Sequence, residues 1–232
     1  IVFGDWSSDV CSSDLYTIRL KPGIPYAANP CFGLDEQGTP RSRDVRADDF
    51  VLAFKRIADF HIPTRLAWSF LDGRIAGLND FRNETQRRKE GDFARYDLPV
   101  EGLAALDDLT LRIKLTNPFP QLAHVLALNA YAPIPRELID FHFATQPDGR
   151  GDRKPIPLDD RSATITRIEQ MIGTGPYIMT RWQRGAKIVF ERNPLYKHGF
   201  YPAEGAPGDA ESGILADADR KSTRLNSSHR IR

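Results

Sequence analysis

The residues of this chain that could do chemistry include its histidines, Cys31 and a pair of neighbouring carboxylates between two apolar runs. A zinc or other metal site needs several such ligands at short, regular spacings along a helix or loop. The histidines within the main body of the chain lie far apart and show no such spacing: they are His61, His124, His142 and His198. The sequence therefore favours ordinary polar roles for them and predicts no metal site.

The carboxylate pair is Asp107-Asp108, which could suggest acid–base catalysis. It separates two apolar runs, and carboxylates in such turns accept hydrogen bonds from the nearby backbone, so we interpret it as turn chemistry. Cys31 has no histidine partner in sequence, so we interpret it as a small buried or half-buried apolar residue rather than a nucleophile. No serine-hydrolase elbow, zinc-protease helix, Cys-x-x-Cys pair or phosphate loop is present. We predict no catalytic residues and no cofactor, and keep an α/β hydrolase with a convergent triad as an alternative.

The two ends of the chain differ in character from the rest. Residues 5–15 and 219–228 are polar and show no hydrophobic period. One oligonucleotide can encode the first segment, and its reverse complement encodes the second, which resembles a sequencing-library adaptor joined to an environmental DNA fragment. We therefore treat residues 1–15 and 219–232 as adaptor-like artefacts and exclude them from fold reasoning, together with Cys11.

Composition excludes several classes of protein. The 232 residues are 41% hydrophobic and 27% charged, with a formal net charge of +1, which is typical of a globular chain and gives no electrostatic reason to expect nucleic acid as a partner. No apolar segment approaches the roughly 20 residues of a membrane span.

Regular elements are predicted from hydrophobic periodicity. Tyr16, Ile18 and Leu20 alternate with polar residues as a half-buried strand does, and residues 45–59 carry an apolar stripe at helical spacing with Asp48 and Asp49 in the first turn. Two runs around the aspartate pair, residues 100–106 and 109–115, predict a hairpin. Charges of both signs alternate in residues 78–97, which favours a solvated helix or loop.

Further elements follow towards the C-terminus. Short helices are predicted at residues 122–128, 133–139 and 163–172, and a polar loop at 148–161. Gly173-Thr174-Gly175-Pro176-Tyr177 predicts a tight turn in which glycine supplies positive φ. It leads into a second hairpin of strands 177–182 and 187–192, whose loop contains Gly185.

Several of these segments, and their order along the chain, resemble those of a known family. The strand Tyr16–Leu20, the helix Val45–Asp59 with its closing Lys-Arg-Ile-Ala-Asp, the Asp-Asp hairpin and the turn with its hairpin through Tyr196 resemble the extracytoplasmic solute-binding proteins of ABC transporters, family 5, which bind oligopeptides, dipeptides or nickel. The resemblance implies an α/β fold of the type II periplasmic-binding-protein kind, two-lobed and incomplete here. It implies a small family-specific lobe in residues 16–132, part of the main lobe in 133–203 and a truncated continuation in 204–218.

The resemblance also implies a function. It suggests the substrate-binding component of an ABC transporter, located in the periplasm or otherwise outside the cytoplasm, that captures a peptide or small solute and delivers it to a membrane permease. The protein would be peripheral to the membrane through the transporter or a lipid anchor. Trp68 and Phe70 follow the best helix, in a region that lies near the ligand cleft in relatives, and are candidate substrate-binding residues; the alternative is that they cover the edge of the core. A ligand-sensing domain of a regulator is a second functional alternative.

Overall fold

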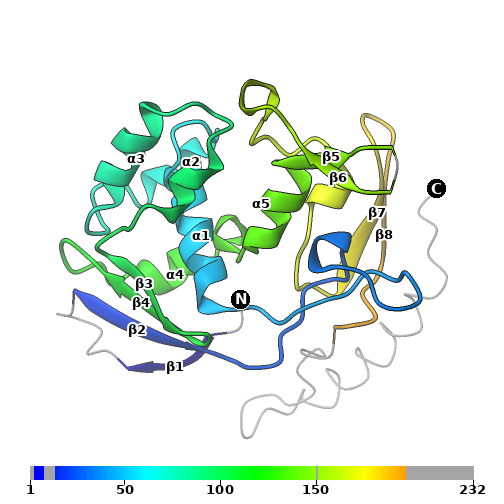
Figure 1. The fold of residues 1–232 in the computed structure, drawn as a ribbon. Coiled ribbons are helices and arrows are strands. Elements are labelled where there is room, and N and C mark those ends of the chain that lie inside the picture. Colours follow the sequence, from blue (N-terminus) through cyan, green and yellow to red (C-terminus); the bar gives the residue numbers. More distant parts are fainter. Residues whose placement is uncertain (1–2, 8–13, 150, 197–232) are drawn as a thin grey trace, which may run out of the picture. The chain divides into compact units, whose positions relative to one another are not determined.

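The computed structural model describes residues 3–7, 14–149 and 151–196 (Figure 1). The described residues belong to one compact unit that ends at Tyr196. His198, residues 204–218 and the 219–232 end, all named above, lie outside the described residues. None of the described helices is both long and apolar enough to cross a membrane.

A four-stranded antiparallel sheet has the strand order β1-β2-β4-β3. Its strands are β1 (Phe3–Ser7), β2 (Leu15–Leu20), β3 (Leu103–Asp107) and β4 (Thr110–Lys114). Tyr16 pairs with Ile113 and Ile18 with Leu111, and all four side chains are buried. The period of two in these strands therefore sends one face of the sheet into the core, as predicted.

Helix α1 (Ala47–Ala58) packs on β3 and β4 and against α3 (Figure 1). Asp48 and Asp49 lie in its first turn and Lys55 and Arg56 in its last, the distribution that the helix dipole favours. Phe50, Phe54 and Ile57 are buried. The predicted helix 45–59 is thus confirmed, and the observed helix begins two residues later and ends one residue earlier.

Shorter helices complete the α/β unit. They are α2 (Arg65–Ser69), α3 (Leu78–Gln86), α4 (Leu122–Leu126) and α5 (Arg136–His142). The 3-10 turns are η1 (Pro30–Phe32), η2 (Phe93–Asp97), η3 (Asn129–Tyr131), η4 (Leu158–Asp160) and η5 (Ile168–Gln170). Two hairpins follow α5: β5 (Thr145–Pro147) with β6 (Arg153–Pro155), and β7 (Tyr177–Gln183) with β8 (Lys187–Arg192).

Several expectations from sequence were wrong. Residues 163–172 contain only the 3-10 turn η5 in place of a helix, and part of the expected loop 148–161 pairs as β6 with β5. The N-terminal end also contains an element, because β1 pairs with β2. For β1 and β6, backbone pairing with another strand overrides the weak local preference. The adaptor origin of the two ends and the lobe boundary at residue 132 stay predictions.

Candidate ligand-facing surface at helix α2

Helix α2 and its C-terminal cap contain both candidate binding residues. Ala67 and Leu71 are buried, whereas Leu66 is 75% exposed and Phe70, the C-terminal cap residue, is 37% exposed. Residues four apart lie on the same side of a helix, so Leu66 and Phe70 are neighbours on the outward side. Trp68 is half-buried and packs against the core cluster. The structure therefore places both predicted residues on one short element, and their contact with a ligand stays a prediction.

A cation lies against the aromatic rings next to α2. The guanidinium carbon of Arg82, on α3, lies 4.8 Å from the ring centroid of Trp68 and 5.5 Å from that of Phe60, and its Nη1 donates to the carbonyl oxygen of Ala58 at 2.9 Å. Such stacking contributes about 0.5–1 kcal/mol at a partly exposed position and holds the rings in place. We call the group of residues that presents these rings the α2 surface: Phe60, Leu66, Trp68, Phe70 and Arg82.

The loop between α1 and α2 is fixed to the end of α3 by hydrogen bonds. The backbone N–H of Phe60 donates to Thr85 Oγ1 at 3.0 Å. His61 Nε2 lies 3.1 Å from the carbonyl oxygen of Thr85 and 2.9 Å from that of Arg88. Carbonyl oxygens only accept, so this nitrogen carries a proton and donates to both. His61 is thus a structural residue that positions the α2 surface.

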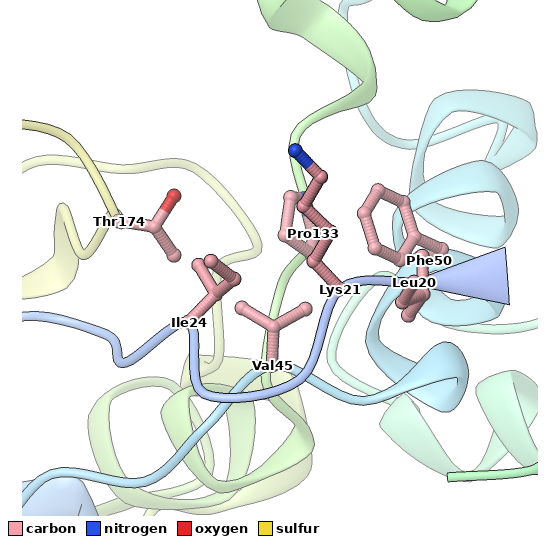
Figure 2. Close-up of a pocket in the computed structure, with 7 residues that line it drawn as sticks. All are labelled: Leu20, Lys21, Ile24, Val45, Phe50, Pro133 and Thr174. Carbon is pink, nitrogen blue, oxygen red and sulfur yellow. The ribbon is translucent and has the colours of Figure 1, made fainter. Parts of the chain in front are cut away.

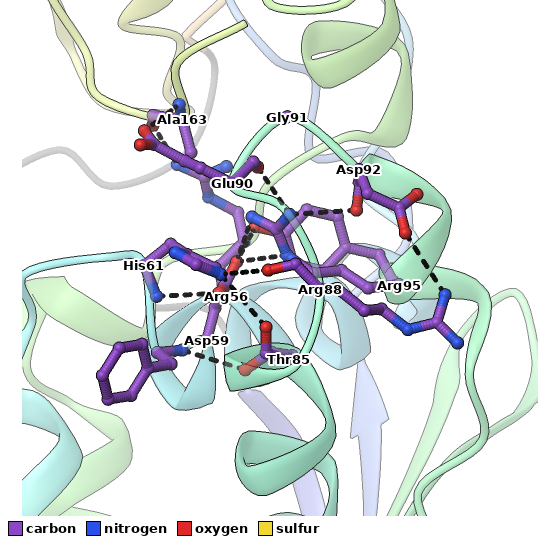
Figure 3. A network of polar contacts seen from close by, with 12 residues as sticks. Arg56, Asp59, His61, Thr85, Arg88, Glu90, Gly91, Asp92, Arg95 and Ala163 are labelled. Atoms are coloured by element: carbon purple, nitrogen blue, oxygen red, sulfur yellow. Dashed lines mark hydrogen bonds and ion pairs between the residues drawn. The ribbon is translucent and has the colours of Figure 1, made fainter. Parts of the chain in front are cut away.

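A buried ion pair lies behind this loop (Figure 3). Asp59 and Arg95 are fully buried, and the carboxylate of Asp59 accepts from Arg95 Nε at 2.8 Å, from the hydroxyl of Tyr96 at 2.6 Å and from the backbone N–H of His61 at 3.0 Å. Arg95 Nη2 lies 2.7 Å from the same carboxylate. Burial is the main cause that raises the pKa of Tyr96, which keeps its hydroxyl a donor. Asp59 therefore connects the loop to η2 in a dry environment.

Arg95 and Arg82 belong to the stretch that the sequence suggested was merely solvated. The structure has a helix there, α3, and Arg87 and Lys89 are exposed as expected. The expectation was wrong for Phe81, Thr85 and Arg95, which are buried. The interspersed charges of residues 78–97 gave no sign of which one faces the core.

The other residues that could take part in catalysis or metal binding do not lie close together in the structure. His142 Nε2 lies 3.1 Å from Asn29 Oδ1, and His124 is exposed on α4. Burial raises the pKa of the Cys31 thiol to about 12, so it is protonated at neutral pH. Asp107 accepts from the backbone N–H of Leu109 at 2.8 Å, which confirms the turn interpretation. The described residues contain no cluster of three or more His, Cys, Asp or Glu suited to a metal ion.

The Gly-Thr-Gly-Pro-Tyr stretch borders a small cavity (Figure 2). Its volume is about 30 Å³, close to the share of one water molecule. The backbone beside it is tied by Ala27 N–H to the carbonyl oxygen of Gly173 at 2.8 Å. Neither Gly173 nor Gly175 has positive φ, which corrects the expected reason for the glycines, whereas Gly185 in the hairpin loop does, at 74°. The cavity is lined by Leu20, Lys21, Ile24, Val45, Phe50, Pro133 and Thr174.

Known structures define the class of fold. The chain is similar to the murein tripeptide binding protein MppA of Escherichia coli, with a TM-score of 0.56 and 19% identity over 84% of this chain and 30% of that one. It is also similar to a periplasmic oligopeptide-binding protein of Borrelia burgdorferi, with a TM-score of 0.54 and 19% identity over 84% of this chain and 30% of that one. The α/β fold is therefore that of periplasmic binding proteins, which confirms the predicted fold class.

The family is shown by sequence. Residues 13–211 match the model of the bacterial extracellular solute-binding proteins, family 5 (middle region), and the chain belongs to this family. The periplasmic oligopeptide-binding protein OppA of Salmonella typhimurium is 28% identical over 68% of this chain and 23% of its own length. The probable deoxycholate-binding periplasmic protein YgiS of Escherichia coli is 26% identical over 60% of this chain and 26% of its own length. The chain thus spans about a quarter of the length of these relatives.

Proposed function

We propose that this chain is part of the substrate-binding component of an ABC transporter that captures a peptide or a related small solute between two lobes and delivers it to a membrane permease. The family match over residues 13–211 carries this proposal. Support comes from relatives described as oligopeptide-binding or murein tripeptide binding proteins. The protein would act outside the cytoplasm, peripheral to the membrane through its transporter or a lipid anchor, and without chemistry of its own.

The α2 surface suits capture better than catalysis. The exposed side chain of Phe70 and the exposed part of the half-buried Trp68 ring offer apolar area, and Arg82 holds a positive charge against the Trp68 ring. Aromatic faces stack on planar peptide groups and on varied apolar side chains, so they give affinity without strict selectivity. Closure of two lobes about a hinge would bury such a surface together with the ligand.

The test uses the complete gene, amplified outward from the codons for Val45–Asp59 in the source DNA. The full protein is titrated with short peptides by calorimetry, and Trp68→Ala is expected to lower peptide affinity by roughly tenfold or more. Trp182→Ala is the matched control, because Arg184 lies 4.8 Å from the Trp182 ring as Arg82 does from Trp68. Equal affinity losses in both variants would show that the α2 surface is not part of the ligand site.

The same gene tests the role in transport. An export signal and a second lobe in the complete product, with peptide binding, would support the proposal. A DNA-binding domain would instead indicate a sensor within a regulator, and a close Ser/His/Asp triad would indicate a hydrolase. Either result would refute the proposed role in transport but would not change the assignment of the fold.

A further inference from the structure

Arg56, in the last turn of α1, is a buried cation without a carboxylate partner among the described residues (Figure 3). The residue is only 6% exposed. Its Nη2 donates to the carbonyl oxygen of Ala163 at 3.2 Å, and its guanidinium carbon lies 5.7 Å from the ring centroid of Phe143. Its Nη1 is buried and has no hydrogen-bond partner in the described part of the chain. A buried guanidinium in this state is costly, and an anion beside it would offset the cost.

Arg56 lines a cavity of about 210 Å³. Apart from Arg56 and Gln170, the walls are apolar and come from the segment before α5, from α5 and its end, and from the segment around η5. Those apolar residues are Ile134, Leu138, Ile139, Phe143, Ile165, Met171 and Ile172. The cavity therefore combines a hydrocarbon-lined volume with one unpaired positive charge.

Gln170 adds a second donor to this cavity. The residue is buried, and its Oε1 accepts from the backbone N–H groups of Thr166 at 2.8 Å and Arg167 at 3.0 Å. Its amide oxygen is thus occupied, so the NH₂ group is the part of Gln170 that can bond to a ligand, and it can only donate. Both polar groups that line the cavity can therefore donate hydrogen bonds, and both suit an acceptor such as a carboxylate.

We propose that this cavity, which is partly open to solvent, binds a small apolar monocarboxylate, with Arg56 pairing with the carboxylate and the apolar walls contacting the hydrocarbon part. A guanidinium matches a carboxylate with two parallel hydrogen bonds, and such charge-assisted bonds are strongest away from water. A cavity of about 150 Å³ holds benzene. The volume of this cavity therefore suits a ligand of roughly the size of benzoate or hexanoate. The site is separate from the α2 surface and does not depend on the transport role.

The test uses the 232-residue chain labelled with ¹³C at its methionine methyl groups. The sequence has two methionines, Met171 in the cavity wall and Met179 on β7, which does not line the cavity. Titration with sodium benzoate is expected to shift the Met171 signal saturably at millimolar concentration and to leave Met179 unmoved. Benzyl alcohol, which has the same ring without the charge, is expected to bind roughly tenfold more weakly.

Two variants complete the experiment. Each variant adds a third methionine signal, which is identified by its absence from the spectrum of the unsubstituted chain. Arg56→Met keeps the aliphatic length and is expected to remove the preference for benzoate over benzyl alcohol. Lys55→Met, the neighbouring buried cation that does not line this cavity, is expected to retain the preference. The proposal is overturned if benzoate leaves Met171 unshifted or binds no better than benzyl alcohol. This comparison needs only the unsubstituted chain, so it decides the matter even if Arg56→Met fails to fold.

Discussion

The replacement Arg95→Met probes the buried ion pair behind the α2 surface. It leaves the fully buried Asp59 carboxylate with the Tyr96 hydroxyl and the His61 N–H but without its cation. Removing one partner of a buried pair costs about 3–5 kcal/mol, a large part of the roughly 5–15 kcal/mol that stabilises a typical domain. With a urea slope of about 2 kcal/mol/M, the unfolding midpoint should fall by about 1.5–2.5 M.

The matched control for this measurement is Arg136→Met. Arg136 pairs with Asp97 at 2.6 Å and Asp140 at 3.1 Å, but its side chain is 37% exposed and those of its partners are 66% and 57% exposed. Solvent screens such pairs, so the expected loss is at most about 1 kcal/mol. The double variant Asp59→Asn/Arg95→Met removes both buried charges and should be more stable than the sum of the single losses predicts. Similar losses for Arg95→Met and Arg136→Met would refute the reasoning.

Two further predictions concern pH and backbone packing. Burial, helped by Arg167 and Arg153, lowers the pKa of His142 to about 4, below the roughly 6.5 of an unfolded histidine. The unfolded chain therefore takes up the proton first, and the free energy of unfolding should fall by up to about 3 kcal/mol as the pH drops from about 6.5 to about 4. In urea titrations across that range, His142→Gln should lose less stability than the original chain. Identical pH dependence of the two chains would contradict this prediction. In Gly102→Ala the new Cβ would lie 2.6 and 2.7 Å from two backbone carbonyl oxygens, so a loss of about 1–3 kcal/mol is expected. Gly173→Ala meets nothing within 4 Å and should stay within about 1 kcal/mol of the original chain by thermal unfolding.

The sequence predicted correctly which side chains are buried wherever the periodicity of a single segment determines their burial. The alternation of β4 buries Leu111 and Ile113 and exposes Arg112 and Lys114, as its pattern predicts. The apolar stripe of α1 is buried in the same way. The glycines of residues 173–175 show the limit, because the chain only bends at residues 174–176 and neither glycine has the positive φ that was expected.

The sequence by itself determined the strands of the sheet, the main helix α1 and the order of segments that places the chain in its family. Helix α2, which carries Trp68, was not predicted. Only the tertiary structure decided which charges are buried. Asp59 and Arg95 are 36 residues apart, and nothing within either segment distinguishes Arg95 from its solvated neighbours. Arg82 and Arg56 show the same limit, one stacked on Trp68 and one unpaired beside an apolar cavity. The physical reason is that periodicity reports which face of an element is buried, whereas the energy of a charge depends on its distance to partners and water in three dimensions.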